Sequence, residues 1–205
     1  AVSMNSANLF PARSEEEALE MIREFAESRP QDPWIIGASW DAGYWDTQQL
    51  PNRSSLDRIL PDRPVLMFHA EGHYAWVNSK ALEIANITRH TENPSYGMIG
   101  KDENGEPNGL LYEKAMDAVI LHAYDFTKEQ KRELFTNFLT HAAGLGVTSV
   151  HDLFAIEALE MLNDYDVFKE FEDNGDLTAR IHLWPALNGN LEHVKKIRET
   201  YQSDK

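Results

Sequence analysis

The densest group of residues that could do chemistry is the segment His69-Ala70-Glu71-Gly72-His73. Zinc deaminases place a glutamate two positions after a histidine ligand, but their sites also need a Pro-Cys-x-x-Cys ligand pair. The chain has no cysteine, so that chemistry is excluded. The zincin motif His-Glu-x-x-His needs two histidines one helical turn apart, and Gly72 interrupts any helix here. The pattern favours one histidine at a strand end and the other in a loop over a pair of metal ligands.

A second polar pair, His151-Asp152, follows the apolar run 147–150. In α/β barrels the chemistry gathers at the carboxyl ends of the strands, so this pair is a candidate for ligand contact. Alternatively, Asp152 caps the next helix and His151 packs at the edge of the sheet. Both interpretations stay open on the sequence alone.

An aromatic and acidic loop follows a predicted strand over residues 34–40. It contains the residues Trp40, Asp41, Tyr44, Trp45 and Asp46. Such a loop could line a pocket for a partly apolar ligand, or it could form a satellite hydrophobic cluster under a long loop. The chain has no Gly-x-Ser-x-Gly elbow, phosphate-binding glycine loop or dinucleotide fingerprint, which excludes the commoner hydrolases, kinases and dehydrogenases.

The segment Asp102-x-Asn104-x-Glu106 resembles a calcium-binding loop in outline. The sixth position of such a loop should be glycine, and here it is Pro107. Asn104-Gly105 between apolar runs instead predicts a β-hairpin, in which both turn residues take a positive φ.

Length and composition restrict the class of protein. The 205 residues are 42% hydrophobic, which is enough for the core of one domain or two small ones. The formal charge of −15 argues against a nucleic-acid partner, and no apolar run is long enough for a membrane span. The absence of cysteine excludes disulfides but leaves the compartment open, with the cytoplasm favoured. Neither end carries a targeting or boundary signal, so we expect a piece of a longer protein.

The secondary structure pattern changes along the chain. Up to residue 115, short strands at 34–40 and 64–69 alternate with short helices. Ser14 and Glu17 have capping-box spacing before the first helix, and Asn78 or Ser79 can cap another. After residue 127, the pattern is helix, strand, helix, strand, helix, with strands at 147–151 and 179–184. This order is typical of a parallel sheet with crossover helices, and the boundary falls between 115 and 126.

Several blocks in a fixed order resemble the YtcJ-like branch of the amidohydrolase superfamily, metal-dependent hydrolases built on a (β/α)₈ barrel. The most specific block is Gly-His-x-Ala-Trp-Val-Asn-Ser-x-Ala-Leu at 72–82. The other blocks lie at residues 34–41, 56–57, 61–66, 102–115 and 146–152. The resemblance covers nearly the whole chain.

The resemblance implies an α/β fold in two parts. Residues 12–115 would be an α+β domain inserted after the first barrel strand, as a cover for the active site. Residues 127–205 would be partial (β/α) units of a TIM barrel, with strands two and three. The family's metal ligands lie on the first strand and on later strands, and this chain lacks them. It is therefore expected to hold no cofactor and no catalytic residue, and to be inactive alone. The parent enzyme would hydrolyse C–N bonds of non-peptide amides with water activated by a divalent metal, for which zinc is favoured.

Family position and residue type together suggest the candidates for substrate contact. They are Trp40, Asp41, His73 and Asn78 from the inserted domain, and His151 and Asp152 at a barrel strand. The expected partner is a small-molecule substrate, with no nucleic acid and no membrane, and open strand edges favour self-association of the fragment. One alternative is a non-catalytic ligand-binding or interaction module. Another is a self-contained metalloenzyme that uses His69, His73, His151 and His182.

Overall fold

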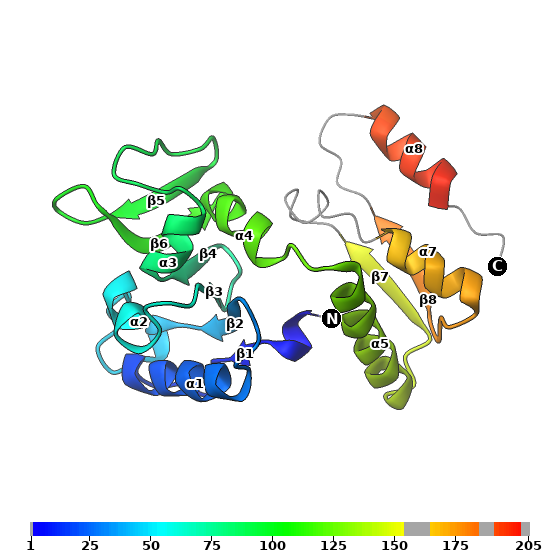
Figure 1. The fold of residues 1–205 in the computed structure, drawn as a ribbon, viewed down its shortest axis with the longest axis horizontal. Coiled ribbons are helices and arrows are strands. Elements are labelled where there is room, and N and C mark those ends of the chain that lie inside the picture. The colour runs from blue at the N-terminus through cyan, green and yellow to red at the C-terminus, as the bar shows by residue number, and fades with distance from the viewer. Residues whose placement is uncertain (1, 154–164, 185–190, 202–205) are drawn as a thin grey trace. The chain divides into compact units, whose positions relative to one another are not determined.

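The computed structural model describes residues 2–153, 165–184 and 191–201 (Figure 1). These residues form two compact units. The first comprises residues 2–123, and the second comprises the described part of 124–205. The predicted α/β class is confirmed in this coarse sense, since both units combine helices with β-sheets. No helix among the described residues is long and apolar enough to cross a membrane.

Unit 2–123 is built on a six-stranded sheet. Its strands are β1 (Ala7–Asn8), β2 (Ile35–Trp40), β3 (Val65–His69), β4 (Tyr74–Val77), β5 (Gly97–Lys101) and β6 (Pro107–Glu113). The spatial order is β1-β2-β3-β4-β6-β5. β1, β2 and β3 are parallel, whereas β4, β5 and β6 pair with their neighbours in antiparallel fashion. The predicted strands at 34–40 and 64–69 are thus adjacent in the sheet.

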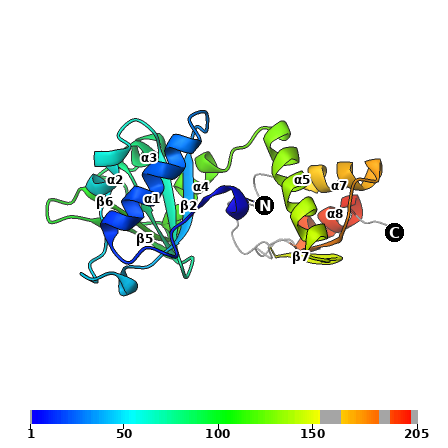
Figure 2. The ribbon, with the colours of Figure 1, turned by 90° about the horizontal axis from the view of Figure 1, so that it is seen from below.

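Four α-helices and three 3₁₀ helices accompany this sheet. They are α1 (Glu15–Ser28), α2 (Arg53–Ile59), α3 (Ser79–Ile84), α4 (Asp117–Ala123), η1 (Val2–Asn5), η2 (Ala42–Tyr44) and η3 (Lys114–Met116). α1 lies across one face of the sheet (Figure 2). There it buries Leu19 and Ile22 in a cluster with Val65, Met67 and Trp76. α2 adds Leu56 to this cluster, while α3 contacts β3 and β6.

The start of α1 differs in one detail from the predicted capping box. The Glu17 amide donates to Oγ of Ser14 at 3.1 Å, as predicted. The Glu17 carboxylate, however, accepts from the amide of Arg13 at 2.7 Å, one residue before the cap. The first turn still has both expected features, a hydroxyl cap and negative charge near the positive end of the helix dipole.

The hairpin β5–β6 is confirmed, but the predicted turn type is wrong. Gly105 has φ +78°, whereas Asn104 is not among the residues with positive φ. The turn is longer than two residues because the Asp102 carboxylate accepts from the amides of Asn104 and Glu106, both at 2.9 Å. This side-chain link stabilises a loop in which only the glycine needs the left-handed conformation.

The second unit follows the predicted order of elements. They are α5 (Lys128–Gly144), β7 (Ser149–Leu153), α7 (Tyr165–Asn174), β8 (Arg180–Trp184) and α8 (Leu191–Tyr201). β7 and β8 pair in parallel, from Ser149 opposite Arg180 to Leu153 opposite Trp184. The first part of the helix that the sequence predicts from residue 156 lies outside the described residues. α5 begins with a complete capping box between Thr127 and Gln130.

The two faces of the β7–β8 sheet differ in exposure. Phe135 of α5 and Val167 of α7 form a buried cluster, against which Val150 and Ile181 of the sheet pack. Exposure alternates along β8, and its other face carries the exposed His182. The helices α5 and α7 therefore cover one face, and within the described residues the other face is open.

An ion pair joins α5 to α7 and predicts a pH dependence. Arg132 binds the Glu170 carboxylate through Nε at 2.7 Å and Nη2 at 2.9 Å, and Lys128 Nζ binds it at 2.9 Å. The hydrogen bonds from Arg132, then those from Lys128, lower the pKa of Glu170 to about 2. A carboxylate whose pKa is lower in the folded state stabilises that state above its unfolded pKa, and this contribution is lost as pH falls through the folded value.

Glu170→Gln should therefore lower the urea midpoint of this unit at pH 6, and the gap to the unsubstituted chain should shrink between pH 4.5 and 2.5. Glu129→Gln is the matched control, because Glu129 lies 3.6 Å from Arg132 and its side chain is 80% exposed. A gap that stays constant over this pH range would contradict the prediction.

Candidate functional site

Three strands of unit 2–123 bring predicted site residues to one end of the sheet. β2 ends at Trp40 and β3 ends at His69, and these two residues are partners in the parallel register. Asp41 and His73 follow these strands by one and four residues. The last residue of β6 closes the same end, since the Glu113 amide donates to the His73 carbonyl at 2.8 Å. The geometry thus gathers Asp41, His69 and His73 from two separate stretches of sequence.

Trp40 belongs to the core and does not line an open surface. Ser39 has φ +71°, and the register shifts between Ala38 and Trp40, which marks a β-bulge. A bulge breaks the alternation of side chains, and Trp40 joins the cluster of Met67 and Trp76 with no exposed area. Its indole N–H donates to the Met67 carbonyl at 2.8 Å. Of the two interpretations of the aromatic loop, the structure favours a hydrophobic cluster for Trp40.

Asn78 is fully buried and makes hydrogen bonds through both ends of its amide. Its oxygen accepts from the amides of Val65 and Ala81, both at 3.0 Å. Its nitrogen donates to the carbonyls of Leu60 and Arg63, both at 2.8 Å. An amide side chain has two donors and a carbonyl with two lone pairs, so Asn78 has no hydrogen-bonding capacity left for a ligand. It caps α3 and ties β3 to the chain before it.

His69 forms a buried contact with Asp41. The imidazole is 5% exposed and stacks on Tyr74, with ring centres 4.1 Å apart. Its Nδ1 accepts from the Glu71 amide at 3.2 Å, so the ring proton of the neutral form lies on Nε2. That nitrogen lies 3.5 Å from Oδ1 of Asp41, which also accepts from the Gly43 amide at 2.7 Å.

Two half-buried tyrosines continue this ring stack. Tyr112 stacks on Tyr74 with ring centres 5.2 Å apart. Burial raises the pKa of the Tyr74 phenol, and the charges of Asp41, Tyr112 and Glu71 raise it further. Burial also raises the pKa of Tyr112. Both phenols therefore keep their protons at neutral pH, and of the two it is Tyr74 whose pKa the Asp41 carboxylate raises.

His73 is the most accessible candidate at this end. Its Nδ1 lies 2.9 Å from Oε1 of Glu113, and the two side chains are 67% and 57% exposed. Glu113 takes φ +49°, a conformation that costs a non-glycine residue roughly 1–3 kcal/mol. An exposed imidazole–carboxylate pair can bind or exchange protons with a ligand without rearrangement of the core.

The pair His151-Asp152 lies inside β7, so the prediction that it ends the strand is wrong. The strand runs to Leu153, because residues 149–153 pair with β8 throughout. Successive residues of a strand point to opposite faces, and so the structure separates the two side chains. His151 is exposed and stacks on His182 with ring centres 4.7 Å apart, and Trp184 donates to its Nδ1 at 3.0 Å.

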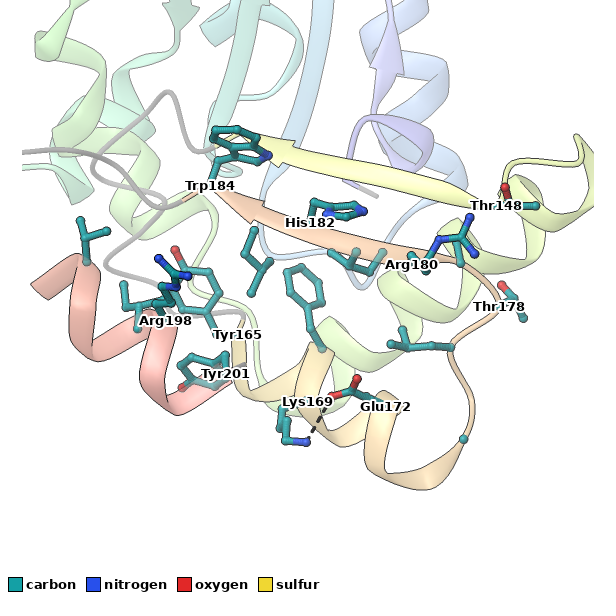
Figure 3. Close-up of a pocket in the computed structure, with 18 residues that line it drawn as sticks. Thr148, Tyr165, Lys169, Glu172, Thr178, Arg180, His182, Trp184, Arg198 and Tyr201 are labelled. Atoms are coloured by element: carbon teal, nitrogen blue, oxygen red, sulfur yellow. Dashed lines mark hydrogen bonds and ion pairs between the residues drawn. The ribbon is translucent and has the colours of Figure 1, made fainter. Parts of the chain in front are cut away.

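A groove of about 1040 Å³ lies between β8, α7 and α8 (Figure 3). Figure 3 shows Tyr165, Arg198 and Tyr201 on the helix side and His182 and Trp184 on β8. The lining carries one ion pair, Lys169 to Glu172 at 3.2 Å. No sequence pattern predicts this groove, since its lining mixes apolar residues with charged ones such as Lys169 and Arg198 from separate elements.

The described residues do not fit a metal centre. Within 2–153, 165–184 and 191–201, no group of three or more His, Asp or Glu side chains could hold a metal ion. The hypothesis of a four-histidine metal site divides its residues between the units, with His69 and His73 in one and His151 and His182 in the other. No described group of side chains supports it.

His69 is the residue near the site whose role the sequence analysis missed. The sequence pattern favours a strand end for one histidine of segment 69–73 and a loop for the other, and the structure confirms this, because β3 ends at His69 and His73 lies before β4. The contact of His69 with Asp41, 28 positions earlier, was not predicted. The signal was indirect, since both residues lie at or just after the carboxyl end of a predicted strand. Only the parallel pairing of β2 and β3 brings them together.

Comparison with solved structures identifies the fold. Two uncharacterized metal-dependent hydrolases, from Pyrococcus horikoshii and Pyrococcus furiosus, match 96% of the chain with TM-scores of 0.64 and 0.60. At 22% and 24% sequence identity these matches establish the fold alone. The sequence profile of the amidohydrolase family then matches residues 2–205. The chain belongs to the amidohydrolase family, which confirms the resemblance seen in its sequence blocks.

Relatives within the family are much longer than this chain. The protein named as amidohydrolase YtcJ of Bacillus subtilis is 33% identical over 174 residues, which are 83% of this chain and 32% of that protein. The N-substituted formamide deformylase of Arthrobacter pascens is 30% identical over 69% of this chain and 27% of its own length. The chain thus spans about a third of the length of the relatives that it matches.

Proposed function

We propose that the chain is part of a longer metal-dependent hydrolase that cleaves C–N bonds of non-peptide amides. The observation that carries this proposal is the family match over residues 2–205 in a chain one third as long as its relatives. The similarity to a formamide deformylase supports an amide-like substrate. Family membership implies a divalent metal in the longer protein, and we propose zinc. Because the described residues do not fit a metal centre, the ligands would lie outside them, and this chain alone would be inactive.

We propose separate roles for the two units. Unit 2–123 would be the domain inserted after the first barrel strand, where it shapes the substrate pocket and excludes water. The parallel strands β7 and β8 would be barrel strands two and three. Two observations support this assignment, the helical cover on one face of β7–β8 and the open face that carries His151. Asp41 and His73 are our candidates for substrate contact in the first unit, while Trp40 and Asn78 support the scaffold.

Hydrolysis of N-butylformamide tests this function. The 205-residue chain and the longer protein that contains it would each be incubated with zinc, and released butylamine would be measured with an amine-reactive dye. We expect release by the longer protein and none by the chain. Binding without release by the longer protein would instead favour the alternative of a non-catalytic ligand-binding module.

Replacing His73 by alanine in the longer protein separates a substrate contact from a structural role. We expect kcat/KM for N-butylformamide to fall about tenfold or more, which corresponds to about 1.4 kcal/mol. The free energy of unfolding should change by less than about 1 kcal/mol, because the pair with Glu113 is exposed. His90→Ala, at an exposed histidine of the same unit, should change neither quantity. A loss of stability alone would show that His73 is structural.

A further inference from the structure

The two oxygens of Asp41 have different surroundings. Oδ1 accepts from the Gly43 amide at 2.7 Å and faces Nε2 of His69 at 3.5 Å. Oδ2 has no hydrogen-bond partner among the described residues, and the Asp41 side chain is 29% exposed. One oxygen is therefore held by the protein while the other remains available. An ionised carboxylate is an acceptor only, and its hydrogen bonds to N–H donors are among the stronger ones in proteins.

His69 has the converse arrangement. Its Nε2 is buried and has no hydrogen-bond partner among the described residues, while Nδ1 accepts from the Glu71 amide at 3.2 Å. The ring cannot turn freely, because it is stacked on Tyr74 and meets the Trp40 indole edge-on at 5.0 Å. The buried N–H thus faces one carboxylate oxygen, and a shift of a few tenths of an ångström would complete the hydrogen bond.

We propose that His69 is a positioning residue, which holds the Asp41 carboxylate so that Oδ2 accepts a hydrogen bond from the N–H of a secondary amide substrate and from the amine product. This inference rests on the proposed function. The part of the substrate that this site would recognise is the nitrogen side of the C–N bond. The Tyr74 phenol lies close enough for the Asp41 charge to raise its pKa, and it is a weaker acceptor than the ionised carboxylate. A site that hydrogen-bonds an N–H group discriminates against analogues that lack one. An ester has no N–H group, so its binding should not depend on Asp41.

Two substitutions of His69 separate its role in holding the Asp41 carboxylate from its role in packing against Tyr74. His69→Phe keeps an aromatic ring for the stack with Tyr74 and removes the N–H. His69→Gln removes the ring and keeps an amide N–H that can reach Asp41. Nε2 has no completed hydrogen bond to lose among the described residues, but Nδ1 is the acceptor for the Glu71 amide, and His69→Phe removes that acceptor. We therefore expect the Tm of the His69→Phe chain to fall by only a few degrees, as the loss of a single hydrogen bond would cause.

Kinetics in the longer protein with N-butylformamide and butyl formate provide the functional test. We expect His69→Phe and Asp41→Asn each to raise KM for the amide five- to tenfold and to leave KM for the ester unchanged. The double variant should show no further increase, since the two residues act as one unit. His69→Gln should recover most of the affinity for the amide. If Asp41→Asn raises KM and His69→Phe does not, the positioning role is overturned.

Side-chain NMR on the 205-residue chain tests the pairing without any activity. Two-bond ¹H–¹⁵N correlations should show His69 protonated on Nε2, and Asp41→Asn should shift that nitrogen while leaving His90 unchanged. An Nδ1-protonated ring, or no response to Asp41→Asn, would overturn the inference. If the NMR result holds but the longer protein hydrolyses neither probe, the proposed function fails and the Asp41–His69 pairing still stands.

Discussion

Replacing Asn78 by alanine is expected to lower the free energy of unfolding of unit 2–123 by about 4 kcal/mol. The substitution removes four hydrogen bonds and leaves the amides of Val65 and Ala81 and the carbonyls of Leu60 and Arg63 without a partner. An unsatisfied buried polar group costs about 1–3 kcal/mol, and partial relaxation keeps the total below the full sum. Urea unfolding followed by tryptophan fluorescence measures this change, because four of the five tryptophans lie in this unit.

Asn52→Ala provides the matched control for Asn78→Ala. Asn52 also caps a short helix, but it is exposed, and among the described residues its side-chain oxygen accepts only from Ser54, from the amide at 2.9 Å and from the hydroxyl. The loss of such a cap costs about 1 kcal/mol. Equal effects of the two substitutions would mean that Asn78 acts only as a helix cap. They would also return Asn78 to the set of candidate substrate contacts.

Replacing Gly109 by alanine should destabilise the same unit by about 4 kcal/mol. Gly109 lies in β6 with φ +96°, a conformation that strains any L-residue with a side chain. A Cβ atom there would lie 2.5 Å from the Val77 carbonyl oxygen and 2.8 Å from the Arg53 nitrogen. Both atoms belong to the backbone, so the clash can be relieved only by moving β4 or α2.

Gly105→Ala separates the two causes of the destabilisation expected at Gly109, which are backbone strain and a steric clash of the new Cβ atom. Gly105 has φ +78°, but a Cβ atom there would meet nothing within 4 Å. Its replacement should cost only the conformational strain, about 1–2 kcal/mol. If both alanine variants unfold at the same urea midpoint, close packing around Gly109 contributes nothing, and the arrangement of β4, β6 and α2 would need revision.

Much of the fold could be predicted because local chemistry decides it. Ser14 starts α1 with the hydroxyl cap that the sequence indicates, and Thr127 starts α5 in the same way. The C-terminal end of α5 has a similar local cause. Gly146 takes φ +73° and donates to Ala143, while Val147 donates to Ala142, the pattern of a helix stop that favours glycine. Hydrophobic periodicity and helix caps depend on residues only a few positions apart, and over this range a sequence pattern predicts secondary structure.

The details that escaped prediction depend on contacts between distant residues. Trp40 is buried because a bulge at Ser39 redirects it, and no local pattern signals that bulge. The side chains of His151 and Asp152 point to opposite faces because β7 extends along β8 three residues beyond the apolar run 147–150. Asn78 was correctly proposed as a helix cap, yet its bonds to Leu60 and Arg63 arise only in the folded unit. The contacts within the candidate site could therefore be found only from the structure, whereas the family could be identified from sequence blocks.

We propose that this chain is one portion of a longer metal-dependent hydrolase whose metal ligands lie elsewhere. Elemental analysis after dialysis tests it most directly, with the 205-residue chain and the longer protein measured side by side. We predict that the chain retains no stoichiometric divalent metal and that the longer protein retains it. Near-stoichiometric, tightly bound metal in the 205-residue chain would contradict this account and would make a metal site built from its own histidines the leading hypothesis.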